Sequence, residues 1–219
     1  MNTLSLGKSG ISPGVVQKIA ELLNEEIYPE IFEHGGVGAS GDLVQLAHLA
    51  LGLIGEGYVY HKGQRHKTSE LFAQKGIQPL ELKLRDGLAI INGTSCMTGV
   101  GVLNYFHSKN LLNLSIAASS MLNEIISSYD DSFSAELNNA KLHYGQQKVA
   151  SEMRNFLSGS KLIRNREEFL FTDSEESRQT IFREKVQEYY SIRCVPQILG
   201  PVWDTLEESR KILEQEINS

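Results

Sequence analysis

The glycine-rich stretch GGVGASGDL at residues 35–43 carries residue types that could do chemistry in more than one way. Gly36, Gly38 and Gly41 have the GxGxxG spacing of a dinucleotide site, in which a pyrophosphate rests on a helix N-terminus. That fingerprint needs a buried parallel strand directly before the glycines and an acidic residue about 20 residues later. YPEIFEHG precedes these glycines instead, and the positions about 20 residues further on fall in a polar stretch. The context therefore argues against a dinucleotide site.

A second phosphate-binding pattern stands near the start of the chain. Gly7-Lys8-Ser9 ends like a P-loop, in which a further glycine is required five positions before the first of these residues. Asn2 occupies that position here, so the P-loop interpretation fails as well.

The tripeptide Ala39-Ser40-Gly41 offers a different chemistry. If the turn brings the Gly41 amide nitrogen onto the Ala39 carbonyl carbon, a five-membered ring closes through the Ser40 backbone and the carbonyl oxygen leaves as a first water. Loss of the Ser40 hydroxyl as water then leaves an electrophilic methylidene-imidazolone. Each residue type suits this reaction, because glycine has no Cβ to obstruct the approach, serine carries a hydroxyl that can be eliminated, and alanine is small.

A ring of this kind would gain from lying next to a helix N-terminus. Negative charge that develops on its oxygen would be stabilised by the free N–H groups and by the positive end of the helix dipole. Such an electrophile could accept an amine that is otherwise a poor leaving group. The alternative is a structural glycine turn that stays unmodified and caps a buried helix.

A helix is expected before this turn. Ser12 and Pro13 give an N-cap followed by a first-turn proline, and the apolar positions after them predict a helix over 13–25. Tyr28-Pro29 predicts its end and the start of a loop that runs to the glycine turn.

A second helix is expected directly after the turn. Asp42 is placed to cap or charge its start, and apolar residues follow at helical spacing. GYVYHKGQRHKT at 57–68 then predicts a small β-hairpin, the only strand pair that the sequence indicates. The apolar positions of the helix are Leu43, Leu46, Ala47, Ala50, Leu53 and Ile54.

From Leu84 onward the sequence is helical in character. LRDGLAII predicts a short helix, and the stretch 94–129 carries alanine, leucine and isoleucine at helical spacing, with Gly99 and Gly101 placed to interrupt it. The polar residues 158–178 lack periodicity and predict a long surface loop.

A last helix is expected after Pro196, kinked or begun at Pro201. The fold class is therefore mainly α with one small hairpin. We expect residues 1–83 to form the segment with the glycine turn and the hairpin, and residues 84–219 to form a helical segment of the same structural unit.

Composition limits the classes of partner. The 219 residues are 41% hydrophobic with a net charge of −6, and the basic residues are scattered, which argues against nucleic acid. Cys96 and Cys194 lie far apart without metal-ligand spacing, so neither a disulfide framework nor a metal site is expected. No apolar run reaches the roughly 18 residues of a membrane helix, and no signal peptide is visible. We expect a cytoplasmic protein.

Three motifs together resemble those of one enzyme family. GGVGASGDLVQLAHLALGLIGEG closely resembles the signature of the histidine, phenylalanine and tyrosine ammonia-lyases, and LAIINGTS and QEYYSIRCVPQILG follow in the family's order and at similar separations. The resemblance implies that Ala39-Ser40-Gly41 forms the methylidene-imidazolone cofactor autocatalytically, with no exogenous cofactor. It also implies the long-helix fold of the fumarase and aspartase-like superfamily. The implied reaction eliminates ammonia from an aromatic L-amino acid to give an α,β-unsaturated acid.

The resemblance assigns four further site residues. Asn92 matches an asparagine beside the electrophile, Gln187 a glutamine beside the prosthetic group, and Tyr190 and Arg193 match a catalytic tyrosine and the arginine that clamps the substrate carboxylate. A planar guanidinium suits bidentate carboxylate binding, and an amide can hydrogen-bond the ring's polar edge. Without the resemblance, Asn92 would be part of a turn or a helix stop, Arg193 a surface charge, Gln187 a solvated side chain, and Tyr190 a core partner of Tyr189.

The resemblance covers this whole chain but only the middle part of a family member. The family's catalytic-base tyrosine and a residue that helps to choose the substrate side chain are expected upstream of it. Family members are tetramers whose active sites combine several subunits. We therefore expect a homo-oligomer and an inactive isolated chain.

Departures from the histidine-type pattern bear on the substrate. Val44-Gln45 stands where many members have Ala-Pro, and Ser95 and Val195 stand where histidine-type enzymes have glutamine. These features resemble bacterial tyrosine ammonia-lyases, so tyrosine is the first expected substrate, giving coumarate, and histidine the second, giving urocanate. An aminomutase with the same cofactor is an alternative, as is a non-catalytic helical interaction module with an unmodified Ala-Ser-Gly.

Overall fold

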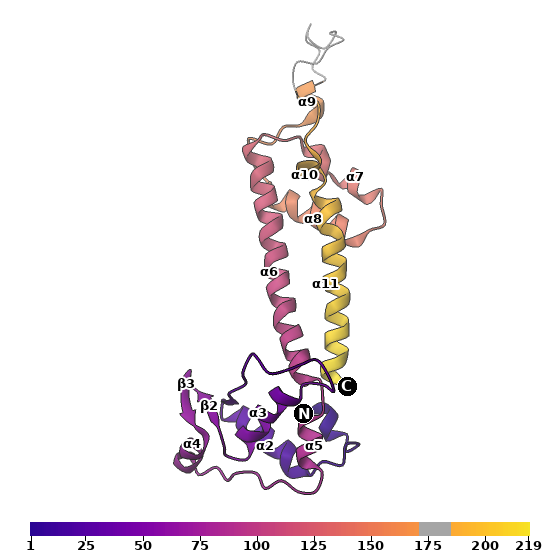
Figure 1. The fold of residues 1–219 in the computed structure, drawn as a ribbon. Coiled ribbons are helices and arrows are strands. Elements are labelled where there is room, and N and C mark those ends of the chain that lie inside the picture. The colour runs from indigo at the N-terminus through magenta and orange to yellow at the C-terminus, as the bar shows by residue number, and fades with distance from the viewer. Residues whose placement is uncertain (171–184) are drawn as a thin grey trace. The chain divides into compact units, whose positions relative to one another are not determined.

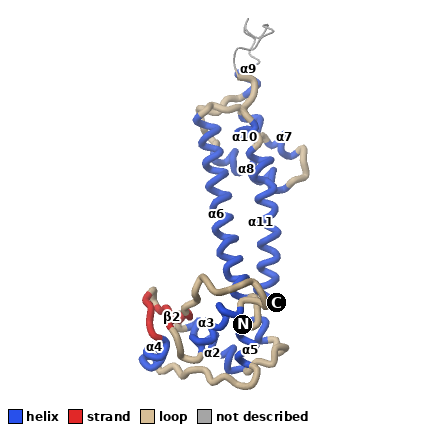
Figure 2. Tube along the Cα trace, in the orientation of Figure 1, coloured by secondary structure: helices blue, strands red, loops and turns tan. Residues whose placement is uncertain are grey.

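The computed structural model describes residues 1–170 and 185–219 (Figure 1). Within these residues helices dominate and three short strands form one sheet, as expected for a mainly α class (Figure 2). The chain divides into two compact units, one of Met1–Val102 with Leu213–Ser219 and one of Leu103–Ile212. Each unit has a hydrophobic core of its own. The division between residues 83 and 84 that the sequence suggested stays a prediction.

The first unit has helices around a small sheet, and its helix ends follow local signals. α2 begins as predicted, because Ser12 is extended and Pro13 occupies the first helical position, where a missing N–H is no loss. α4 ends at Lys75 and is followed by Gly76, which takes the left-handed conformation that glycine adopts without strain. The elements are α1 (Asn2–Ser5), α2 (Pro13–Asn24), β1 (Ile27–Pro29), α3 (Leu43–Leu53), β2 (Tyr58–His61), β3 (Gln64–Lys67), α4 (Thr68–Lys75), α5 (Asp86–Ile91) and the start of α6 (Ser95–Ile125).

The sheet has the order β1-β2-β3 and is antiparallel throughout. The β2–β3 hairpin confirms the prediction, with Lys62 and Gly63 at its turn both at positive φ, as a tight two-residue hairpin requires. β1 was not predicted, so the expectation of a single strand pair was wrong, whereas the loop expected after Tyr28-Pro29 is present over residues 30–42. Proline is compatible with β1 because that strand lies at the edge of the sheet, where one missing N–H costs no ladder bond.

The core of the first unit lies between α2, α3, α4 and the sheet. Each large aliphatic or aromatic side chain buried in this core contributes about 1.5–3 kcal/mol to the stability of the fold, relative to the same side chain exposed. The buried cluster is Val15, Leu22, Ile27, Leu53, Val59, Leu71, Phe72, Ile77 and Ile90. Because the cluster includes residues of α3 and of α5, it fixes these two helices against each other.

A buried carboxylate ties the start of α2 to the start of α5. Asp86, 1% exposed, accepts hydrogen bonds from the Ser12 backbone N–H and hydroxyl, each at 2.8 Å, and from the Lys83 N–H at 2.9 Å. Burial alone would raise the pKa of Asp86, but these hydrogen bonds outweigh it and hold the pKa below its usual value. The bonds set the position of α5, which ends at Ile91 and is followed by Asn92 as its C-cap residue.

The second unit contains most of α6 and a set of helices packed against it and against α11. Its elements after α6 are η1 (Asp130–Phe133), α7 (Ala135–Asn139), α8 (Tyr144–Phe156), α9 (Arg166–Leu170), α10 (Tyr190–Arg193) and α11 (Val195–Asn218). Its buried cluster is Leu112, Ile116, Phe133, Val149, Met153, Leu157, Val195 and Trp203. α6 and α11 run side by side (Figures 1 and 2), and Lys109 joins them through Glu207, at 3.4 Å, and the face of Trp203.

Two glycines let α8 approach α11 closely. A Cβ built on Gly145 would lie 2.1 Å from the Gly200 carbonyl oxygen, so no side chain fits there. The Gly145 N–H also donates to Asp204 Oδ1 at 2.8 Å, which satisfies a free donor at the start of α8.

Several helix boundaries differ from the expectations. α6 runs unbroken through Gly99 and Gly101. α11 begins at Val195 and contains Pro201 in its interior, so the helix does not begin at that proline. α9 lies inside the expected loop 158–178, of which residues 171–178 fall outside the described residues. Along the described part of the chain, no helix has both the length and the apolar character needed to cross a membrane.

Candidate active site

The glycine turn has a backbone that few residue types can adopt. Gly38, Ser40 and Gly41 have φ of +66°, +59° and +81°. Glycine enters this left-handed region freely, whereas serine enters it at a cost in energy. Such a residue outside glycine is often found where function requires the conformation. Ala39 and Ser40 are exposed, so the central residues of the turn face outward.

The turn rests on the backbone that follows α5. A Cβ built on Gly41 would lie 2.4 Å from the Gly93 carbonyl oxygen, and the N–H of Asp42 donates to that same oxygen at 2.8 Å. Only glycine therefore fits at position 41. The contact brings Gly41 to the residue that follows Asn92. The position of Asn92 beside an electrophile stays a prediction.

Asp42 holds the turn from a second direction. It occupies the N-cap position of α3 but makes no side-chain cap to that helix. Its Oδ2 accepts instead from the Met97 N–H at 2.8 Å, so the carboxylate caps the start of α6. Asp42 thus lies at the start of α3 as predicted, but its side-chain hydrogen bond goes to α6. Burial, and then the negative charge of Asp42, raise the pKa of the neighbouring Cys96 thiol.

Two further glycines give α3 room beside the turn. A Cβ built on Gly35 would lie 2.9 Å from Val44, and one on Gly36 would lie 2.5 Å from Gln45. Gly35 and Gly36 therefore lie close against the first turn of α3, whereas Gly41 packs on Gly93 and Gly38 meets nothing within 4 Å. Close packing thus accounts for Gly36 and Gly41 of the GxGxxG spacing.

The other predicted site residues lie in the second unit, at α10. The Arg193 guanidinium lies 4.5 Å from the centre of the Tyr190 ring, close enough for a cation–π interaction. Tyr190 is 73% exposed and Gln187 is also exposed, while Arg193 is half-buried with no hydrogen bond to its Nε atom in the described residues. The structure thus brings Tyr190 and Arg193 together and leaves the buried Nε donor of Arg193 without a partner among the described residues.

The residues of the turn fit the ring that the sequence predicts. Position 41 admits no side chain, because a Cβ there would meet the Gly93 carbonyl oxygen, so it holds the residue type that the ring closure needs. Ser40 is exposed and left-handed, and its hydroxyl makes no hydrogen bond to the described residues. The start of α3 follows directly, which places free N–H donors and a positive dipole end beside the turn.

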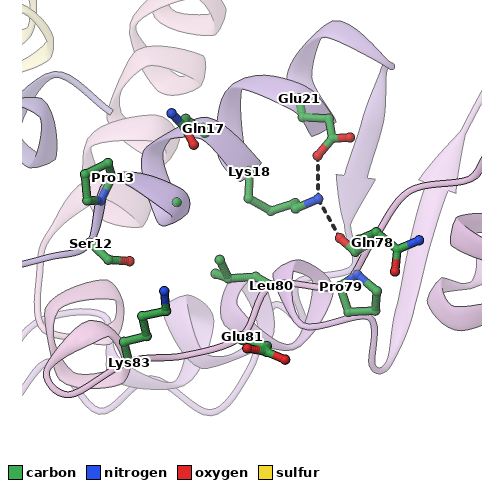
Figure 3. Close-up of a pocket in the computed structure, with 11 residues that line it drawn as sticks. Ser12, Pro13, Gln17, Lys18, Glu21, Gln78, Pro79, Leu80, Glu81 and Lys83 are labelled. Carbon is green, nitrogen blue, oxygen red and sulfur yellow. Dashed lines mark hydrogen bonds and ion pairs between the residues drawn. The ribbon is translucent and has the colours of Figure 1, made fainter.

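A pocket of about 580 Å³ lies elsewhere in the first unit, between α2 and residues 78–83 (Figure 3). The Lys18 ammonium donates to the Gln78 carbonyl at 2.6 Å and pairs with Glu21 at its edge. No sequence motif marked these residues, and the pocket contains none of the predicted site residues. The pocket is therefore separate from the candidate site.

Comparison with known proteins identifies the family. A family model described as aromatic amino acid lyase matches residues 1–219. The chain is 40% identical over 223 residues to a tyrosine 2,3-aminomutase of a Myxococcus species and 38% identical over 218 residues to a histidine ammonia-lyase of a Geobacillus species, with 100% of this chain covered in both. A crystal structure of a tyrosine aminomutase from Streptomyces globisporus matches 99% of this chain at 37% identity, with a TM-score of 0.87.

The chain belongs to the aromatic amino acid lyase family, and its fold is that of the family's lyases and aminomutases. It spans about two-fifths of the length of the relatives, 42% of the aminomutase and 40% of the histidine ammonia-lyase. The resemblance stated from the three motifs is confirmed at the level of the family.

Proposed function

We propose that the native protein carrying this chain eliminates ammonia from an aromatic L-amino acid and yields an α,β-unsaturated acid. The observation that carries the proposal is the close packing of Gly41 on the Gly93 carbonyl, next to a Ser40 in the left-handed conformation. The family match over the full chain supports the same chemistry. Tyrosine is the first substrate in this proposal and histidine the second, on the residues Val44, Gln45, Ser95 and Val195.

Ala39, Ser40 and Gly41 would form the methylidene-imidazolone, which supplies an electron-poor group that makes the amine able to leave. Asn92, at the end of α5, would hydrogen-bond the polar edge of the ring, and Gln187 would do the same from the later motif. Arg193 would bind the substrate carboxylate with its guanidinium fork. Tyr190, in contact with that guanidinium, would lie at the reacting face.

An aminomutase is the second candidate, because relatives with that printed name are as similar to this chain as the histidine ammonia-lyases. An aminomutase would return the amine to the neighbouring carbon, so the product would be a β-amino acid. We propose further that the native protein is a cytoplasmic homotetramer, as the family resemblance implies.

Intact-mass measurement of the protein, isolated natively from its own cells, tests the ring. The expected mass is lower than the sequence mass by two water molecules, with an added near-ultraviolet absorbance. Ser40→Ala should remove both signals, while Ser108→Ala, at an exposed position of α6, should keep them. A native protein with an unmodified serine would overturn the proposal and favour a non-catalytic helical module.

Product analysis separates the candidate reactions. Incubation with L-tyrosine and with L-histidine, followed by chromatography, distinguishes coumarate, urocanate and β-tyrosine. Formation of coumarate with released ammonia supports the lyase, whereas β-tyrosine without a matching amount of ammonia supports the aminomutase.

A further inference from the structure

The segment that leads into the Gln187–Arg193 motif is held by two side chains from outside the motif. The Tyr129 hydroxyl donates to the Lys185 carbonyl at 2.7 Å, and the Arg166 guanidinium donates to the Val186 carbonyl. Both acceptors are backbone atoms directly before Gln187. The two side chains therefore act on the path of the chain rather than on any one side chain of the motif.

The two donors form one connected group. The Arg166 guanidinium lies 4.4 Å from the centre of the Tyr129 ring and bonds both oxygens of Asp131, at 2.7 and 3.3 Å. A guanidinium can serve a carboxylate and a carbonyl at once because its five N–H donors are arranged in a rigid fork. Asp131 thus fixes the fork in the orientation that reaches Val186.

Backbone hydrogen bonds join the two stretches of chain that carry Tyr129 and Arg166. The Asp130 N–H donates to the Arg164 carbonyl at 3.1 Å, and the Arg164 N–H donates to the Ser128 carbonyl at 2.9 Å. Tyr129, between them, is only 2% exposed. A hydroxyl on a ring this deeply buried is costly to leave without a partner, so its bond to Lys185 is strongly favoured.

The burial of the side chains at residues 187–189 agrees with a segment whose backbone is held in one orientation. Glu188 is 4% exposed and pairs with Lys185, whereas Gln187 and Tyr189 on either side of it are exposed. The segment therefore turns one side chain inward and leaves its neighbours facing outward. At the far end of the motif, Asn123 of α6 donates to the Ile192 carbonyl at 3.5 Å.

We propose that Tyr129 and Arg166 are positioning residues that hold the Gln187–Arg193 segment in its site geometry. The effect on catalysis rests on the proposed function. The hydrogen bonds to the Lys185 and Val186 carbonyls are a property of the second unit alone. Neither residue lies in any of the three motifs that carry the family resemblance. Their effect on Tyr190 and Arg193 is transmitted through the backbone.

Hydrogen exchange measured by mass spectrometry on the native protein tests the hold. Tyr129→Phe removes only the donor, and Arg166→Lys keeps a charge but cannot serve Asp131 and Val186 together. Each should raise exchange over residues 186–193 about fivefold, the change expected from losing one hydrogen bond, without raising it in α8. Tyr144→Phe, at an exposed tyrosine of α8, and Arg164→Lys should leave 186–193 unchanged.

Steady-state kinetics on the same variants test the catalytic consequence. Tyr129→Phe and Arg166→Lys should each lower kcat/KM at least threefold while the mass deficit of two waters is retained. Unchanged exchange over 186–193, an equal rise in α8, or unchanged kinetics would overturn the positioning role. A native protein without the mass deficit would instead overturn the proposed function, and the exchange result would still decide the hold.

Discussion

Gly41 lies so close to Gly93 that no side chain fits on it, because a Cβ built on Gly41 would be 2.4 Å from the Gly93 carbonyl oxygen. The same oxygen accepts the Asp42 N–H at 2.8 Å. Two segments about fifty residues apart in sequence are thereby locked together at one atom. The geometry makes glycine at position 41 a structural requirement and a requirement of the proposed ring closure at once.

Gly41→Ala should therefore destabilise the fold and prevent ring formation. Alanine is strained at φ +81°, and the atom its Cβ meets is a backbone atom that cannot move aside cheaply. We expect a loss of at least about 2 kcal/mol of unfolding free energy and an intact mass without dehydration. Gly99→Ala is the matched control, because a Cβ there meets nothing within 4 Å and the residue is helical. That control should be neutral or stabilising in urea titration, and equal effects of the two variants would contradict the prediction.

Asp42→Asn should weaken the start of α6 and change the reactivity of Cys96. The amide keeps an oxygen for the Met97 N–H but loses the charge that favours a helix N-terminus, which costs about 0.5–1 kcal/mol. Burial contributes most to the raised pKa of Cys96, and the charge of Asp42 adds to it, so the variant should lower that pKa. Iodoacetamide labelling at fixed pH should therefore become faster at Cys96, with the rate at Cys194 as the internal reference. A slower or unchanged rate would show that the charge does not reach the thiol.

Local patterns predicted the elements whose signals lie within one turn or one hairpin. α2 followed from its N-cap and proline, α3 from its apolar spacing, and the β2–β3 hairpin from alternation around Lys62-Gly63. β1 was missed because its three residues include Pro29 and give no alternation to detect. Gly101 did not break α6 because an interior glycine costs a helix only about 1 kcal/mol, which is not enough to end a helix of 31 residues.

The contacts that build the candidate site join residues far apart in sequence, which local patterns cannot reveal. Motif matching selected Gly41 and Asn92 separately, but the shared contact at Gly93 depends on how α3 and α5 pack. The carboxylate of Asp42 was assigned to the nearer helix because only sequence neighbours were considered. Tyr129 and Arg166 carried no signal, since an aromatic and a basic residue in a polar region are common on any surface.

Asp86→Asn should make the first unit less sensitive to acid. The pKa of Asp86 is lowered in the folded state, so its contribution to stability is present above the unfolded pKa of about 4 and is lost as the pH falls toward the folded value. At pH 7 the variant should lose roughly 2 kcal/mol of unfolding free energy, because the charge-assisted hydrogen bonds from Ser12 and Lys83 are weakened. Below about pH 3 the difference from the parent should shrink. Urea titrations at the two pH values measure it, with exposed Glu81→Gln as the control. A difference independent of pH would contradict the assignment.

Arg193→Lys should weaken substrate binding without affecting ring formation. Lysine offers a compact charge in place of a planar fork and loses the contact with the Tyr190 ring, so a bidentate bond to the substrate carboxylate cannot form. We expect KM for the amino acid to rise about tenfold, equivalent to one good hydrogen bond, while the mass deficit of two waters is kept. Arg210→Lys is the matched control, because that arginine lies in α11 and pairs with Glu207. Arg193→Lys separates two roles. A raised KM with the mass deficit retained places Arg193 at the substrate, whereas loss of the mass deficit would mean that Arg193 is needed for ring formation in the glycine turn. An unchanged KM would remove Arg193 from the site altogether.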